Sequence, residues 1–168
     1  MRFIFSALLA VFFAGQTFAT PIQLVAKIDS GQVVPPTTSL AFGTGAFVYD
    51  AASNILAWAI VVTDALFTSP ETSALLHEPA AVGFVGPSIS SLGLGSLTFG
   101  AVDLDDVCVD ASLCEADLLS GLWYAQVSTE SYPGGEIRGQ ILPVAEPSIM
   151  LLLGISGLAL FDRRQHRV

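Results

Sequence analysis

Few side chains in this chain of 168 residues could do chemistry, and the most suggestive are His77, Cys108 and Cys114. Glu78 follows His77 directly, so an imidazole and a carboxylate lie side by side in the sequence. Zinc and copper sites need three or four such ligands, and one histidine supplies too few. We therefore expect His77 to be an ordinary surface or hydrogen-bonded residue that holds no metal.

Cys108 and Cys114 are the two cysteines of the chain, and only a short loop separates them. No histidine or further thiol lies near them in the sequence to complete a metal site. An exported protein matures where disulfides persist, and the chain ends described below indicate export. We predict that the two cysteines pair, which would stabilise the fold by about 2 kcal/mol.

Carboxylates gather around the cysteines, between Asp103 and Asp117. Carboxylate oxygens are the natural ligands of calcium, but the spacing and the glycine of an EF-hand loop are missing. The stretch therefore indicates a solvated acidic loop pinned by the cysteines, with calcium binding as the alternative.

Glu136 and Arg138 lie two residues apart, which places them on one face of a strand. An acid–base couple would need a nucleophile nearby, and an arginine does not give up its proton. We expect an ion pair on the strand face, which would be worth about 0 to 1 kcal/mol if it is exposed. No nucleotide-binding loop, nucleophile elbow or catalytic-cysteine signature occurs. The sequence thus predicts no catalytic residue, no cofactor and no enzymatic activity.

The charge balance of the central part of the chain is strongly acidic. Between Thr20 and Pro147, two basic residues stand against fourteen acidic ones, a net charge of −12. Such a surface repels phosphate backbones, so nucleic acid is excluded as a partner.

The first residues have the pattern of a secretory signal peptide. After Arg2, the run from Phe3 to Ala14 is apolar except for one serine, and small residues precede a cleavage point between Ala19 and Thr20. We predict that residues 1–19 are removed on export.

The last residues carry a second apolar run, from Ile149 to Phe161, followed by Arg163 and Arg164. As a helix this run would rise roughly 20 Å, against a hydrocarbon core of about 30 Å. That is short for a permanent anchor. A transient insertion into the inner membrane with the arginines on the cytoplasmic side is physically reasonable.

Glu146, Pro147 and Ser148 come directly before this apolar run. Together with the helix and the basic tail they resemble the bacterial PEP-CTERM sorting signal, with Ala145 in place of the first proline. The resemblance covers residues 144–168. It implies cleavage by an exosortase in a Gram-negative host that makes exopolysaccharide. An ordinary C-terminal membrane anchor is the alternative.

The interval from residue 20 to 143 has the composition of strands and turns. Ile22, Leu24, Ala26 and Ile28 alternate with polar residues, and the runs 45–49 and 55–63 predict a hairpin. The second run is apolar at nearly every residue, which predicts a central strand covered on both faces, with Trp58 in the core. Further strands are expected at 83–85, 96–102, 122–129 and 135–142, and a helical turn at 115–119.

The fold class predicted is therefore all-β. It comprises a single antiparallel β-sandwich or Greek-key barrel, flanked by an N-terminal signal helix and a short C-terminal hydrophobic helix. No internal repeat or second domain is visible between residues 20 and 143.

Three stretches of this interval resemble the CHRD domain, a module found in chordin and in many bacterial exported proteins. They are residues 32–38, 75–80 and 124–140, and the last contains Glu136, Arg138, Gly139 and Gln140. The family commonly has two histidines and a third from a neighbouring strand where this chain has Leu75, His77 and Ser128. The resemblance implies a depleted histidine site.

The two resemblances together predict an exported cell-surface or matrix protein of structural or interaction type. We expect its partners to be the exosortase and either exopolysaccharide or other surface proteins. The alternatives are a metal-binding or redox module and a carbohydrate-binding module.

Overall fold

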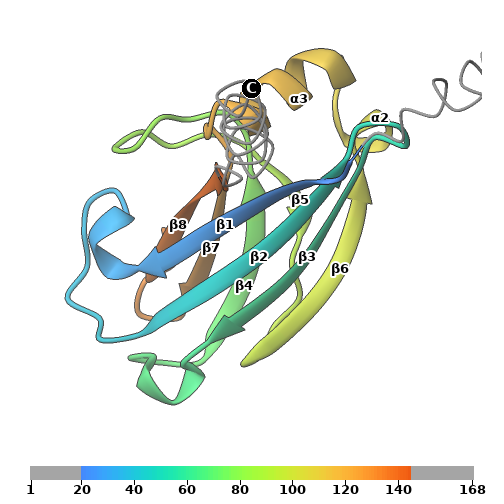
Figure 1. Ribbon diagram of the computed structural model, residues 1–168. Helices are drawn as coiled ribbons and strands as arrows, with labels where there is room; N and C mark the ends of the chain where they lie inside the picture. Colours follow the sequence, from blue (N-terminus) through green and yellow to red (C-terminus); the bar gives the residue numbers. More distant parts are fainter. Residues whose placement is uncertain (1–19, 145–168) are drawn as a thin grey trace, which may run out of the picture.

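The computed structural model describes residues 20–144 and shows one antiparallel sheet of eight strands. The strand order is β5-β4-β7-β8-β1-β2-β3-β6, and the sheet curls so that its two halves face one another (Figure 1). The all-β prediction is confirmed. The strands are β1 (Ile22–Asp29), β2 (Phe42–Asp50), β3 (Ile55–Val62), β4 (Glu71–His77), β5 (Ser88–Ser91), β6 (Leu97–Asp103), β7 (Tyr124–Thr129) and β8 (Ile137–Pro143).

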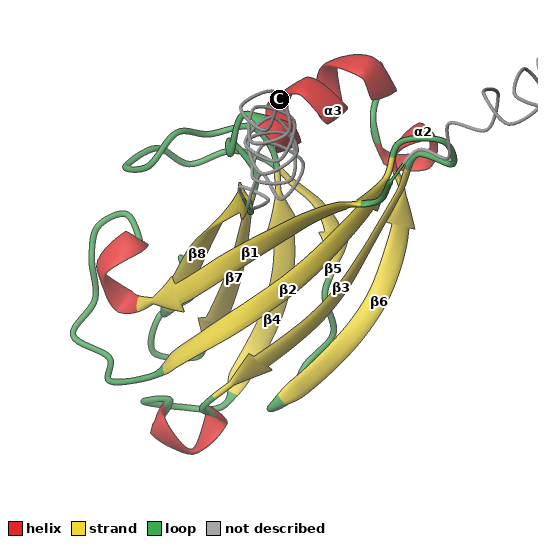
Figure 2. Ribbon diagram, viewed as in Figure 1, coloured by secondary structure: helices red, strands yellow, loops and turns green. Residues whose placement is uncertain are grey.

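Four short helical segments connect the strands (Figure 2). They are η1 (Ser30–Gln32), η2 (Asp64–Leu66), α2 (Leu104–Val107) and α3 (Ala111–Leu119). Among the residues described, no helix combines the length and apolar character that a membrane crossing requires. The predicted signal peptide, residues 1–19, lies outside the described range, as does the predicted sorting signal, residues 144–168, apart from its first residue.

The hydrophobic core lies between the two halves of the sheet. In Figure 1, β1, β2, β3 and β6 form the front layer, and β8, β7, β4 and β5 lie behind it. Each strand sends alternate side chains inward, as the period of two requires. The largest buried apolar side chains are Leu24, Ile28, Phe47, Tyr49, Leu56, Trp58, Leu76, Leu104, Leu118, Trp123, Ile137 and Ile141.

The expectation that β3 is covered on both faces is wrong. Trp58 is in the core, as predicted, but Ile55 and Val61 point to solvent and are 39% and 50% exposed. The run is apolar at nearly every position because the outer face of this sheet half is itself apolar. An unbroken apolar run therefore does not require two covered faces when the strand belongs to an antiparallel sheet.

The segment around residue 84 was predicted as a strand but forms a loop. Gly83 adopts a positive φ of 89°, which ends extended pairing there. The strands of this region are instead β4 and β5, on either side of the loop.

The predicted disulfide between Cys108 and Cys114 is present, with 6.4 Å between the two Cα atoms. The acidic stretch around it is helical rather than a loop. Asp110 caps α3 by accepting hydrogen bonds from the backbone N–H of Ser112 and Leu113, so the helix begins four residues before the predicted turn at 115–119. Asp103 caps α2 in the same way, by accepting from the backbone N–H of Asp105. Two carboxylates of the stretch that was predicted to be a solvated loop are therefore helix caps.

Candidate functional site

The outer face of β4, β7 and β8 is polar and yet buried. It lies beneath two covering segments, residues 30–41 and 78–87, which hydrogen-bond to its side chains. Alternate apolar residues of these strands point the other way, into the core, namely Ala74, Leu76, Ala125, Val127, Ile137 and Ile141. The buried polar layer consists of Ser39, His77, Gln126, Ser128, Thr129, Glu136, Arg138 and Gln140.

Glu136 lies just before β8 and is 0% exposed. Its Oε1 accepts hydrogen bonds from the Ser39 hydroxyl at 2.5 Å and from the Thr68 backbone N–H at 2.9 Å. Its Oε2 accepts from the hydroxyls of Thr68 at 2.9 Å and Thr129 at 2.5 Å. The carboxylate thus joins three segments that lie far apart in the sequence.

The environment of Glu136 sets its protonation state. Burial alone would raise the pKa of the carboxyl, but the hydrogen bonds from Ser39, Thr129 and Thr68 outweigh burial and lower it below the ordinary value. Glu136 is therefore a buried, ionised acceptor at neutral pH.

Arg138 is 1% exposed and sits on the outer face of β8. Its Nη1 donates to the Phe84 carbonyl at 2.6 Å, and its Nη2 donates to Gln140 Oε1 at 3.2 Å. The guanidinium carbon lies 3.4 Å from the centroid of the Tyr124 ring, a cation–π contact. Burial lowers the pKa of Arg138, although an arginine stays charged at physiological pH.

The predicted ion pair between Glu136 and Arg138 is wrong. Both side chains are buried, and each binds other groups. Within residues 20–144 the structure forms one ion pair, between Lys27 Nζ and Asp29 Oδ2 at 3.3 Å. Strand parity predicted one shared face, but Glu136 lies before β8 begins and binds Ser39, Thr68 and Thr129, whereas Arg138 binds Phe84, Gln140 and Tyr124.

His77 is buried, which corrects the surface alternative and supports the hydrogen-bonded one. Its ring stacks on Tyr124 with centroids 4.6 Å apart and planes 8° from parallel. Nδ1 lies 3.0 Å from the Gly86 carbonyl and donates to it when protonated. Burial lowers the pKa of His77 and outweighs that hydrogen bond, so the ring is neutral at neutral pH.

The three positions of the depleted histidine site do not assemble a ligand set. Leu75 pairs with Gln126 across β4 and β7, whereas Ser128 pairs with Ser73, farther along the strands. His77 Nε2 is buried and has no hydrogen-bond partner among the described residues. One imidazole beside a leucine and a serine offers too few donors for a metal.

Gln140 ties β8 to the covering segments. Its Nε2 donates to the carbonyls of Ala80 at 2.7 Å and Gly121 at 2.8 Å. With the bond that Oε1 accepts from Arg138, the side-chain amide uses both its donor and its acceptor groups.

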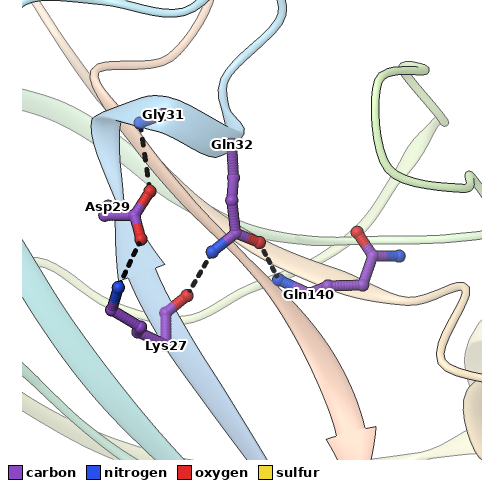
Figure 3. A network of polar contacts seen from close by, with 5 residues as sticks. All are labelled: Lys27, Asp29, Gly31, Gln32 and Gln140. Carbon is purple, nitrogen blue, oxygen red and sulfur yellow. Dashed lines mark hydrogen bonds and ion pairs between the residues drawn. The ribbon is translucent and has the colours of Figure 1, made fainter.

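Gln32 completes the pairing of β1 with β8 where the ladder is interrupted (Figure 3). Its Nε2 donates to the Lys27 carbonyl at 2.6 Å, and its Oε1 accepts from the Gln140 backbone N–H at 3.0 Å. The side-chain amide therefore stands where a peptide group would stand in a regular ladder. Gly139 is needed at this point, because a Cβ there would lie 2.6 Å from the Lys27 carbonyl oxygen.

Glu78 lies against the disulfide, a contact that the sequence did not reveal. Its Oε2 is 3.1 Å from Cys114 Sγ and 3.7 Å from Cys108 Sγ. Burial raises the pKa of Glu78, and the charge of Asp117 adds to the effect. These three side chains could hold a metal by distance, but the disulfide occupies both sulfurs.

These features define a class of small antiparallel β-domain, in which a rolled sheet encloses one core and a buried polar layer ties loops to its outer face. Residues 24–141 match the CHRD domain, and the chain belongs to the CHRD domain family. The domain is typical of secreted and extracellular proteins. No curated protein and no solved structure matches the chain.

The structure brings the three family stretches together. The first supplies Gln32, the second supplies His77, and the third supplies the residues of β7 and β8 that they contact. The sequence did not identify the hydroxyls of Ser39 and Thr68, because nothing in their local pattern points to Glu136. Other partners that it missed are Glu78, Ala80, Phe84, Gly86 and Gln126.

Proposed function

We propose that this protein is a non-enzymatic structural or interaction protein, exported by a bacterium and released at its surface or into its matrix by an exosortase. The observation that supports this proposal is that the charged residues of the family motif are buried and hydrogen-bonded within the domain. Glu136 and Arg138 are 0% and 1% exposed, and their polar groups bind the protein itself. A catalytic acid or base has to reach a substrate, so the motif serves the shape of the domain.

The interaction surface that we propose is on the outside of the domain. The outer face of β1, β2, β3 and β6 carries apolar side chains in solvent, which mark contact surfaces in soluble proteins. Exopolysaccharide and other surface proteins are the partners proposed for it. The most exposed members are Val25, Phe42, Val48, Val61, Leu97 and Phe99.

Intact-mass analysis of the surface and secreted fractions of the native host tests the export and processing. The expected chain begins near Thr20, ends near Glu146 and lacks residues 149–168. Changing Glu146 and Pro147 together to Ala should leave unprocessed precursor, while changing the exposed Gln23 to Ala should not. A surface chain that retains residues 151–168 would make this a simple membrane anchor.

A second candidate function, binding of a metal by the reduced protein, is favoured by the contact of Glu78 with the two cysteines. Reduction would turn both sulfurs into thiolate ligands, and the carboxylate would make three. Zinc content after dialysis distinguishes the candidates when oxidised, reduced and Glu78→Gln proteins are compared. The structural proposal expects no stoichiometric zinc in the oxidised protein. Zinc bound only after reduction, and lost in the Glu78 variant, would favour the second candidate.

A further inference from the structure

The strand β6 is an unprotected sheet edge. β3 pairs with it on one side, and none of the described strands lies on the other. Its pairing with β3 runs unbroken from Leu97 to Asp103, so no bulge twists the edge away. It contains no proline or lysine, and its one charge is at the final residue. Natural edge strands are usually protected by such features, and an edge without them is a template for another strand.

The backbone groups at this edge can be assigned. The Val62 N–H donates to the Ser96 carbonyl, and the Leu104 N–H donates to the Asn54 carbonyl. In an antiparallel ladder, hydrogen bonding to one neighbour alternates along the strand. The even-numbered residues of β6 therefore bond to β3. The odd-numbered residues, from Leu97 to Asp103, direct their N–H and C=O groups to the open edge.

Among the same residues, Leu97, Phe99 and Ala101 have exposed apolar side chains. Leu97 is 59% exposed and Phe99 is 78% exposed, and both point away from the core. They continue the apolar outer face of the front layer, because Leu97 pairs with Val61 and Phe99 pairs with Ala59. The opposite edge, β5, is different, since it has four residues and three of them are serine.

We propose that two copies of this chain associate by antiparallel pairing of β6 with β6, about a two-fold axis at Gly100. In this register Phe99 lies opposite the partner's Ala101, so a large side chain meets a small one. Leu97 lies opposite the partner's Asp103. The outward backbone groups of each copy find their partners in the other copy. The inference deepens the proposed interaction role by naming its surface and its partner.

Charge selects this arrangement over a parallel one. Asp103, Asp105 and Asp106 cluster at one end of β6, whereas residues 79–102 contain no charged residue and one carboxylate, Glu71, accepts from the Gly95 N–H near the other end. A parallel pair would bring the two acidic ends together. An antiparallel pair separates them by roughly 20 Å, about twice the Debye length in physiological salt.

A two-fold axis also fits the side-chain pattern. Directly opposed residues of two antiparallel strands project to the same face of a sheet. The apolar outer faces of the two copies therefore merge into one continuous surface. An isologous pair of this kind closes on itself, because each copy presents the same patch.

Sedimentation velocity of the chain isolated from its host, between about 1 and 100 µM, tests the proposal. The unmodified chain should become dimeric as concentration rises. Ala101→Pro removes an N–H that points to the open edge and leaves the bonds to β3 intact, so it should weaken dimerisation at least about tenfold. Phe99→Lys should do the same by placing a charge in the pairing region.

Val48→Lys is the matched control, because Val48 is exposed and apolar on the same outer face but lies on β2, away from the edge. Its dimer should remain intact. Thermal melts establish that each variant is folded, and hydrogen exchange should show protection of the odd-numbered amides of β6 that rises with concentration. A chain that stays monomeric overturns the inference, and correct processing of that chain would leave the proposed function standing. A dimer that Val48→Lys disrupts and Ala101→Pro does not would mean face-to-face stacking, which also overturns it.

Discussion

Glu136 illustrates how a single buried carboxylate can organise a domain with little other charge pairing. Its two oxygens accept four hydrogen bonds from a loop before β2, a turn before β4 and the end of β7. Hydrogen bonds to an ionised group contribute about 1.5 to 3 kcal/mol each, and a partner left unsatisfied costs a similar amount. The Glu136 side chain therefore holds these three segments together.

Replacing Glu136 with Gln should lower the free energy of unfolding by about 2 to 4 kcal/mol at pH 7. The amide keeps one acceptor oxygen and turns the other into a donor, which faces hydroxyls and an N–H that already donate. Urea denaturation measures the loss. Glu130→Gln is the matched control, because Glu130 is exposed and should change stability by less than about 0.5 kcal/mol. Equal stability of the two variants would contradict the role of Glu136.

The same carboxylate should make stability depend on pH. Its pKa is lowered in the folded state, so the unfolded chain binds its proton at a higher pH. The contribution of Glu136 is therefore complete above the unfolded pKa of about 4.3 and is lost as the pH falls through the folded value. Denaturation curves from pH 7 to pH 3 should show the difference between the natural protein and Glu136→Gln shrinking in acid. A difference that stays constant over this range would contradict the prediction.

Gln32 offers a second test at a single residue. Gln32→Ala removes the amide that joins the Lys27 carbonyl to the Gln140 N–H, so we expect a loss of about 1 to 2 kcal/mol in denaturant. Gln23→Ala, which changes an exposed glutamine of β1, should have almost no effect. Similar losses in both variants would show that the bridge contributes nothing specific.

At the scale of residues, the sequence identified the residues of the family motif correctly, but it did not predict that Glu136 and Arg138 are buried or what they bind. Parity along a strand predicted one face for Glu136 and Arg138, but the two side chains bind different segments. The partners Thr68 and Ser39 lie 68 and 97 positions away from Glu136. No local pattern encodes a contact across such distances, and whether a face is covered depends on where the loops go.

At the scale of elements, alternation and turn residues predicted β1, the hairpin of β2 and β3, β6, β7 and β8. These patterns failed where a strand does not combine an apolar, buried face with a polar, exposed face. β4 carries polar residues toward a buried outer layer, and β3 carries apolar residues toward solvent. The helix α3 was predicted too short, because its start depends on the cap at Asp110 rather than on an apolar period.

The disulfide should stabilise residues 104–119 more than the rest of the domain. Denatured, unreduced protein should contain no titratable thiol, because both cysteines are paired. Changing Cys108 and Cys114 together to Ser should cost about 2 kcal/mol or less, since the closed loop is short. Hydrogen exchange should quicken in residues 104–119 while the strands of the core stay protected. Uniformly faster exchange across the sheet would show that the bridge supports the whole fold.

At the scale of the whole molecule, the acidic charge is almost unpaired. In the described part of the chain one lysine and one arginine accompany the acids, and the arginine is buried. Repulsion among like charges destabilises a compact state and is screened by salt. Stability should therefore increase by about 1 kcal/mol between low salt and 0.5 M NaCl, as thermal melts would show. A variant with Asp106→Asn and Glu130→Gln should respond less, and an equal response would contradict the electrostatic origin.

The order in which the strands are synthesised differs from the order in which they lie in the sheet. β8 is the last strand in the described part of the chain, yet it occupies the middle of the sheet between β7 and β1. Until residues 137–143 have left the ribosome, the front strands and the back strands form two unfinished halves with no ladder between them. For the proposed export, in which the chain would cross a secretion channel unfolded, this arrangement delays closure of the domain until residues 137–143 are made.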